Sequence, residues 1–129
     1  MNVDFDAKPL KKIAAKLENF SRKIQPAMDS NDAEFAVLLL KEVKQRASGR
    51  PGPNIVTGRY VNSFFIVDGR VVNPSPQTRR LEYGYIGVDS AGRMYNQPPF
   101  PHFRPALAAM RPVYVASIPK VFWKTWRSA

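Results

Sequence analysis

Twelve prolines divide this chain of 129 residues and limit how long its helices and strands can run. Proline has no backbone N–H to donate, and its ring clashes with the preceding turn of a helix. Pro26 follows a helix-like stretch, and Pro51 and Pro53 flank Gly52 in a loop that permits neither helix nor central strand. The densest group, Pro98 to Pro105, predicts a stiff and irregular segment rich in aromatic residues.

The residues before the first proline-glycine loop predict two helices. Residues 8–25 repeat apolar side chains every three or four positions, which is the spacing of one helix face. Asp6 can accept from the free amides at the start of this helix, and Pro9 suits its first turn. Pro26 is expected to end it. A second helix over 31–47 begins at a capping-box spacing and should be the more buried of the two.

The middle of the chain predicts short strands. Residues 60–67 are rich in β-branched and aromatic side chains, and the dipeptide Asp68-Gly69 is typical of a hairpin turn. Residues 79–88, "RRLEYGYIGV", form either a short helix that turns into a strand or a strand throughout. A last helix is expected from Arg104 onward.

This order of elements predicts an α+β fold. We expect a single domain over 1–129, with two N-terminal helices, a small and mostly antiparallel β-sheet, and a C-terminal helix. Pro112 and Pro119 fall inside that C-terminal helix, so it is expected to be kinked or broken there.

Charge narrows the classes of partner. Twenty Lys and Arg residues against ten Asp and Glu give a net charge of +10, which favours nucleic acid, an anionic membrane surface or an acidic protein face. The alternative is that dispersed charge only keeps the protein soluble. With no cysteine, the chain has no disulfide, thiolate nucleophile or common zinc framework. No stretch approaches the roughly 18 apolar residues of a membrane span, and the acidic start is unlike a signal peptide.

Candidate catalytic groups are few. Ser63, His102 and Asp89 have the residue types of a hydrolase triad, but no nucleophile-elbow motif accompanies them. Glu82 and Asp89 could form a pair of carboxylates, which is more often structural. The loop "GRPGPN" contains glycines, as phosphate-binding loops do, but it lacks the Walker lysine and the dinucleotide-binding spacing. We therefore expect no catalytic, cofactor or metal site.

One enzymatic alternative stays open. Tyr95, His102 and Arg104 lie close in sequence and are the residue types that small ribonucleases use to move protons and stabilise phosphorane charge. Aromatic residues interleaved with arginines could also bind nucleic acid without cleaving it. Prolines crowd this segment, however, and such density more often wedges a chain against a neighbouring surface.

Two blocks of the sequence resemble a known family. "RPGPNIVTGRYVNSF" and "RRLEYGYIGVDSAGRMYNQPPFPHFRPAL" are similar to the neck or tail-completion proteins of long-tailed bacteriophages, also grouped as head-tail joining or minor tail components. The shared pattern is two helices, a proline-rich loop ending in T-G-R, a strand pair, an L-E-Y-G element, a proline-aromatic loop and P-A-L opening the last helix. The resemblance covers residues 8 to about 111, and "VFWKTW" beyond it matches no pattern of the family.

The resemblance implies a structural role without an active site or cofactor. Such a protein joins the DNA-filled head to the tail as a homo-oligomeric ring subunit, with sixfold symmetry, in the neck of the virion after assembly in the host cytoplasm. Its partners would be the head connector or stopper and the tail terminator or tail tube, with DNA passing through the ring without specific binding and no membrane involved. The alternatives are the tail terminator itself or, in another class, a basic nucleic-acid-binding protein or small ribonuclease.

The two blocks also supply candidate interface or structural residues. Gly58 suits a turn that other residues resist, with Arg59 beginning the first strand, and Gly84 leaves room for close backbone approach. Glu82, flanked by Arg79 and Arg80, is expected to form a salt bridge either within a subunit or between subunits. Phe100 and Phe103 anchor either a neighbouring subunit or the protein's own core. The full set is Gly58, Arg59, Arg80, Glu82, Tyr83, Gly84, Tyr85, Tyr95, Pro99, Phe100, Phe103 and Pro105.

Overall fold

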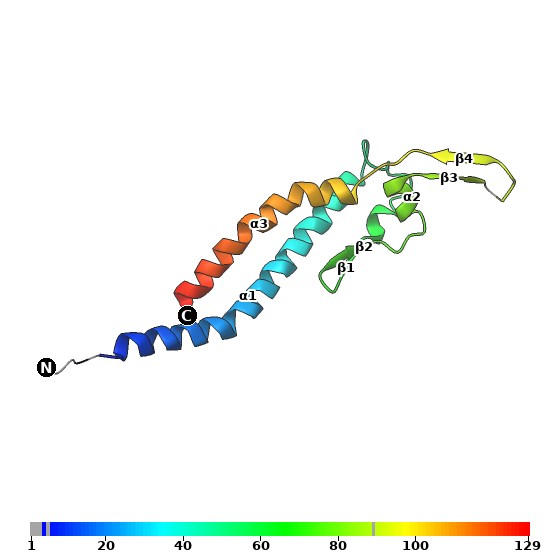
Figure 1. The fold of residues 1–129 in the computed structure, drawn as a ribbon. Coiled ribbons are helices and arrows are strands. Elements are labelled where there is room, and N and C mark those ends of the chain that lie inside the picture. The colour runs from blue at the N-terminus through cyan, green and yellow to red at the C-terminus, as the bar shows by residue number, and fades with distance from the viewer. Residues whose placement is uncertain (1–3, 5, 89) are drawn as a thin grey trace.

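Two long antiparallel helices form the body of the molecule (Figure 1). The computed structural model describes residues 4, 6–88 and 90–129. Helix α1 spans Lys8–Arg46 and helix α3 spans Phe103–Ser128. The end of α1 lies against the start of α3, because Val43 and Ala106 share one buried cluster, while Lys23 Nζ donates to the carbonyl of Ser128 at 2.9 Å.

Helix α1 runs through Pro26, where the sequence predicts a boundary between two helices. The reason is tertiary packing on both sides of the proline. Before it, the ring of Phe20 lies 5.0 Å from that of Phe122, and after it, Asn31 Nδ2 donates to Ser117 Oγ at 2.9 Å. Both halves are therefore aligned on the same helix, α3, and the helix bends in the blue-to-light-blue stretch that contains Pro26 (Figure 1).

Helix α3 is likewise continuous through Pro112 and Pro119, so neither proline breaks it. The start of α1 matches the sequence prediction more closely, since Asp6 Oδ1 accepts from the backbone N–H of Lys8 at 2.9 Å. Tertiary contact along the pair thus offsets the loss of single helical hydrogen bonds at three prolines.

Two separate hairpins complete the fold. Strands β1 (Phe65–Val67) and β2 (Arg70–Val72) pair antiparallel, and so do β3 (Tyr85–Val88) and β4 (Met94–Gln97). The first turn is the predicted Asp68-Gly69, with φ of 49° and 72° at its two residues. The α+β class is confirmed, with two two-stranded sheets rather than one.

The structure shows the conformation of residues 79–88 and the position at which the first strand begins. Helix α2 (Thr78–Tyr83) precedes β3, so the "RRLEYGYIGV" stretch is a short helix that turns into a strand. Arg59 does not begin a strand as predicted. It lies before a 3-10 turn over Val61–Ser63, and β1 starts only at Phe65.

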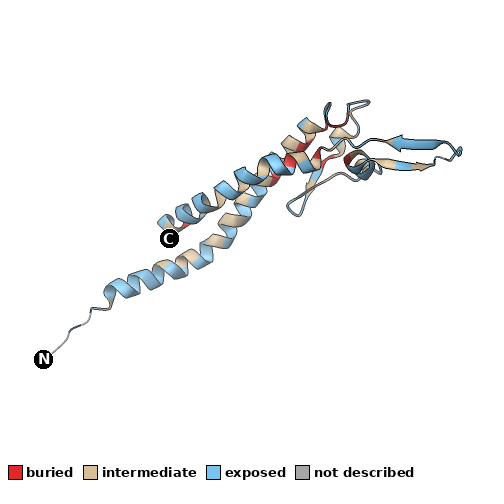
Figure 2. Cartoon of the chain, turned by 45° about the horizontal axis from the view of Figure 1, so that its top comes forward, coloured by how far each residue is buried: buried red, intermediate tan, exposed pale blue. Residues whose placement is uncertain are grey.

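Most of the buried residues gather where the end of α1, the start of α3 and the loops meet (Figure 2), whereas Ala36 and Thr125 are buried further along the two helices. Val43, Ala47, Phe64 and Ala106 form the buried cluster, with Leu39, Leu40, Tyr60, Val61, Val71 and Phe103 packed around it. The chain exposes 9715 Å² of surface. A compact protein of 14.6 kDa exposes about 6,900 Å². The molecule is therefore elongated, with little core for its length.

Gly84 is a position where only glycine fits. It connects α2 to β3 with φ 80° and ψ 171°, a region essentially restricted to glycine. A Cβ atom there would lie 2.9 Å from the carbonyl oxygen of Gln97 and 3.2 Å from Cδ of Pro99. The close backbone approach predicted for Gly84 is confirmed.

We expect Gly84→Ala to destabilise the protein by about 2–4 kcal/mol, because it adds a steric clash to backbone strain. Gly92→Ala is the matched control, since Gly92 has φ 78° but open space around it. It should cost only about 1 kcal/mol. Urea unfolding followed by circular dichroism measures both values, and equal losses would show that the clash with Gln97 and Pro99 is unimportant.

Candidate functional site

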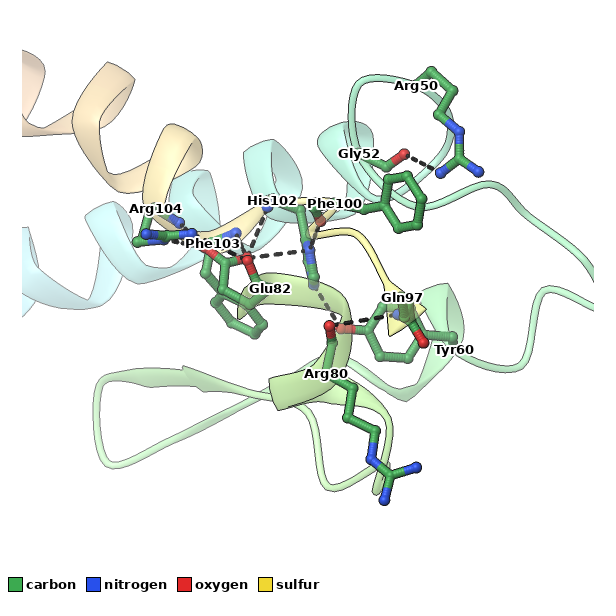
Figure 3. A network of polar contacts seen from close by, with 10 residues as sticks. All are labelled: Arg50, Gly52, Tyr60, Arg80, Glu82, Gln97, Phe100, His102, Phe103 and Arg104. Atoms are coloured by element: carbon green, nitrogen blue, oxygen red, sulfur yellow. Dashed lines mark hydrogen bonds and ion pairs between the residues drawn. The ribbon is translucent and has the colours of Figure 1, made fainter. Parts of the chain in front are cut away.

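A buried carboxylate from α2 binds the first turn of α3. Glu82 is only 2% exposed. Its carboxylate oxygens accept from the backbone N–H groups of His102, Phe103 and Arg104 at 2.8, 3.0 and 2.9 Å (Figure 3). The first N–H groups of any helix lack partners within the helix, and no side chain next to the start of α3 caps them. Glu82 supplies that cap from a distant part of the chain.

The side chain of Arg104 also binds Glu82. Its Nε donates to Glu82 Oε1 at 3.1 Å, and its Nη2 donates to the backbone carbonyl of Glu82 at 3.0 Å. Burial alone would raise the pKa of the Glu82 carboxyl. The hydrogen bonds from the three backbone N–H groups and from Arg104 outweigh burial and lower this pKa below its usual value. The positive end of the α3 dipole acts in the same direction.

His102 joins the same network and has no exposed surface. Its Nδ1 lies 2.9 Å from the carbonyl oxygen of Phe100 and 3.2 Å from Glu82 Oε2. Because a carbonyl can only accept, Nδ1 carries a proton, and in the neutral ring Nε2 then accepts from the Tyr60 hydroxyl at 2.5 Å. Burial and the negative charge of Glu82 raise the pKa of Tyr60 to about 12, so its hydroxyl stays protonated at neutral pH.

The salt bridge predicted for Glu82 has a different partner. The sequence prediction placed Arg79 or Arg80 on Glu82, but Arg104 occupies that position. Arg80 instead lies over the ring of Tyr85, 4.0 Å from its centroid. Arg104 also covers the ring of Tyr83, whose residue is otherwise 60% exposed, at 4.6 Å. Glu82 is thus committed within the chain, and its neighbours Tyr83 and Tyr85 carry the cation–π contacts.

The two phenylalanines of the proline-aromatic segment have different environments. The ring of Phe103 lies 5.3 Å from that of Phe64 and packs against the buried cluster. Phe100 is half-buried, its N–H donates to the carbonyl of Leu81 at 2.6 Å, and Arg50 covers its ring at 3.7 Å. Phe103 therefore serves the protein's own core, whereas Phe100 lies at the surface of a cleft.

That cleft has a volume of about 620 Å³ and lies between the proline-glycine loop and the base of the second hairpin. Gly58, Arg59, Tyr95 and Phe100 are among the residues that line it. Gly58 has φ 79°, as its predicted turn role requires. Val56, which also lines the cleft, is 90% exposed.

The remaining predicted residues lie around this cleft and hairpin. Tyr85 and Tyr95 face each other across β3 and β4 with ring centroids 6.2 Å apart. Pro99 is exposed beside Gly84, and Pro105 is half-buried in the first turn of α3. The hairpin of β3 and β4 projects away from the helices (Figure 1).

The structure describes only some of the catalytic groups considered from the sequence. Asp89, a member of both the triad and the carboxylate pair, lies outside the described residues. His102 cannot contact a nucleic acid in this conformation because it is fully buried and both ring nitrogens have partners. In the described parts of the chain, no three His, Cys, Asp or Glu side chains gather as metal ligands, and no helix is long and apolar enough to span a bilayer.

Sequence reasoning missed the roles of Tyr60, His102 and Arg104 in this network. One signal was available. The segment "PFPHFRPAL" starts a helix without Ser, Thr, Asp or Asn at the capping position. A helix start without a local cap needs an acceptor from elsewhere, and Glu82 is the acid closest before it among the described residues.

We expect Glu82→Gln to destabilise the protein by about 2–3 kcal/mol, because the amide keeps the shape but presents an NH₂ group to backbone donors and loses the charge. Glu42→Gln is the matched control. Glu42 pairs with Arg46 at 2.8 Å one turn away on the surface of α1, and its loss should cost no more than about 0.5 kcal/mol. Equal effects in urea unfolding would contradict the capping role.

The contribution of Glu82 should depend on acid pH. A carboxyl whose pKa is lowered by folding stabilises the native state above its unfolded value, here 4.5, and loses that effect as pH falls through the folded pKa. The free-energy difference between wild type and Glu82→Gln should therefore be constant from pH 7 to about 5 and shrink below 4.5. Urea unfolding across pH 7 to 2.5 tests this, and a difference that stays constant to the lowest pH contradicts it.

Comparison with protein-family models, with curated proteins and with solved structures finds no match to this chain. The function of the protein is therefore inferred below from its own residues and their arrangement.

Proposed function

We propose that this protein is a structural subunit of the neck or tail-completion assembly of a long-tailed bacteriophage, where a ring of copies joins the filled head to the tail. The observation that carries the proposal is the meeting of the two family-like blocks in one buried network. Tyr60 of the first block bonds to His102 of the second at 2.5 Å, and His102 in turn contacts Glu82.

The network holds segments of the two blocks together by hydrogen bonds. It fixes the start of α3, the end of α2 and the loop before the 3-10 turn relative to one another. The hairpin of β3 and β4 projects from this junction (Figure 1), and the cleft lined by Phe100 adjoins it. Both are thus held at defined positions while remaining exposed to neighbours, which is what a subunit of a rigid ring needs.

The amount of exposed surface supports an assembling role. The chain exposes 9715 Å², well above the value of about 6,900 Å² for a compact protein of its mass. Large apolar side chains are part of that surface, including Ile86 at 73%, Met94 at 80% and Val56 at 90%. Apolar groups exposed on an extended subunit are typical of contacts that form on assembly.

The proposed partners are further copies of the chain, the head connector or stopper, and the tail terminator or tail tube. DNA would pass through the ring without specific binding. The net charge of +10 also favours the alternative of a nucleic-acid-binding protein. A nucleic-acid-binding protein would be recognised by its salt dependence. Its affinity falls by about three to five orders of magnitude between 50 and 200 mM salt when six to ten phosphates are contacted.

Deleting the gene in its phage should leave filled heads and complete tails that are separately assembled and unjoined, as seen by electron microscopy. Wild-type protein supplied in trans should restore joined particles. Joined, infectious particles in the deletion strain would refute the proposal, and a reconstruction of the wild-type neck would show whether the protein instead occupies the layer of the tail terminator.

A point substitution sharpens this test. Val56→Asp should prevent incorporation into particles without unfolding the chain, because Val56 is 90% exposed and a charge there would be buried on assembly. Val56→Thr, similar in shape but uncharged, is the control and should be incorporated. Normal incorporation of Val56→Asp would show that the cleft rim is not an interface.

A further inference from the structure

The first three turns of α1 carry an apolar face without a partner among the described residues. Leu10, Ile13 and Leu17 continue the three-four spacing of Phe20 and Ile24, which is the pattern of a helix-packing seam. Further along the seam, Phe20 packs against Phe122 and Trp126 of α3 at 5.0 and 5.6 Å. Helix α3 ends at Ser128, and Leu10, Ile13 and Leu17 are each more than 50% exposed.

Figure 1 shows this overhang, defined as Lys8–Leu17, extending past the end of α3, and Figure 2 shows that it is mostly exposed. The long side chain of Lys16 reaches back to α3, where its Nζ lies 5.0 Å from the centroid of the Trp126 ring. The overhang is therefore a continuation of an established helix–helix interface beyond the end of its partner. An apolar stripe that continues a packed seam is suited to burial against a second surface.

The charges of the overhang limit what can cover it. Four of its ten residues are lysines, at positions 8, 11, 12 and 16, and it contains no acid. Two overhangs side by side would repel each other. The outer part of α3 is also basic, with Lys120, Lys124 and Arg127, so it is equally unsuited as a receiving surface.

One groove of the protein has the opposite character. It has a volume of about 490 Å³ and lies between the middle of α1, Tyr114 of α3 and the turn of the first hairpin. Asp29, Asp32 and Asp68 line it, and no lysine or arginine does. Its apolar lining includes Phe35, whose ring lies 4.7 Å from that of Tyr114. A groove lined by aromatic rings and three carboxylates complements an apolar stripe with lysines around it.

We infer that the overhang of one copy docks in this groove of a second copy. The contact cannot form within one chain, because Ile13 and Ala33 are separated by twenty residues of the same helix, or about 30 Å. It joins two different surfaces, so it is heterologous and can be repeated from copy to copy. The inference rests on the proposed function only in that copies of the chain assemble, and it names the surfaces that meet.

Cysteine cross-linking tests the contact directly, because the natural chain contains no cysteine. Chains carrying Ile13→Cys are mixed with chains carrying Ala33→Cys at high concentration and treated with a short bismaleimide. We expect covalent heterodimers in at least about fivefold greater yield than with Ala15→Cys in place of Ile13→Cys. Ala15 is exposed on the opposite side of the same helix, so it is the matched control.

Charge reversal tests the pairing of the two surfaces. Lys12→Glu in the first chain should reduce the yield about fivefold, and adding Asp29→Lys to the second chain should restore it. Lys41→Glu, a reversal elsewhere on the exposed side of α1, should leave the yield unchanged. Failure of the double reversal to restore cross-linking would overturn the assignment of the groove.

Two other outcomes would also overturn the inference. One is equal cross-linking by Ile13→Cys alone, which would mean that overhangs pair with each other. The other is no cross-linking above the Ala15→Cys control at any concentration. Because the experiment uses the isolated chain, either outcome leaves the head-tail proposal standing, while joined particles from a deletion strain would refute that proposal and leave the cross-linking result intact.

Discussion

The rest of the structure depends on the hydrogen bonds between the Glu82 carboxylate and the first N–H groups of α3. A helix start that lacks a local cap leaves polar groups without partners, and here they are buried. Glu82 provides both the acceptor oxygens and the negative charge. It thereby connects α2, a helix of six residues, to α3, a helix of 26 residues that begins twenty positions after the end of α2. The cleft and the second hairpin adjoin these hydrogen bonds, whereas the first hairpin packs against α1.

The long helices are stabilised differently. Prolines interrupt the hydrogen bonding of both. What keeps them continuous is mutual contact, with aromatic pairs at one end and the small buried residues Val43 and Ala106 at the other. Helix–helix contacts thus stabilise the long helices, and the Glu82 hydrogen bonds fix the irregular segments. Together they explain how a chain with little core can hold a defined geometry.

Local patterns in the sequence predicted several parts of this fold. The Asp68-Gly69 turn, the Asp6 contact at the start of α1 and the special backbone of Gly84 all follow from the preferences of the residues themselves. The continuity of α1 through Pro26 could not be predicted in the same way, because it depends on contacts with residues about a hundred positions away. Tertiary packing overrode a correct local preference.

In the candidate site, too, some features could be predicted from the sequence and others could not. Glu82 and Phe103 could be identified as important from the residue pattern, yet their partners could not. Sequence proximity favoured Arg79 and Arg80 for Glu82, whereas the fold brings in Arg104, because a carboxylate at a helix start can accept from its backbone and from a side chain of the same turn at once. Pairings of this kind depend on topology, which spacing along the chain does not encode.

The uneven distribution of buried residues has a consequence for the motions of the molecule. The hydrophobic residues Val43, Ala47, Phe64 and Ala106 all lie near the Glu82 junction, whereas the opposite ends of α1 and α3 meet mainly through surface aromatic rings. Local opening costs least where few apolar contacts are broken, so amide hydrogens near Phe20 and Trp126 should exchange with solvent faster than those near Val43. The helix pair can therefore open locally near Phe20 and Trp126 while the region around Glu82 keeps its structure.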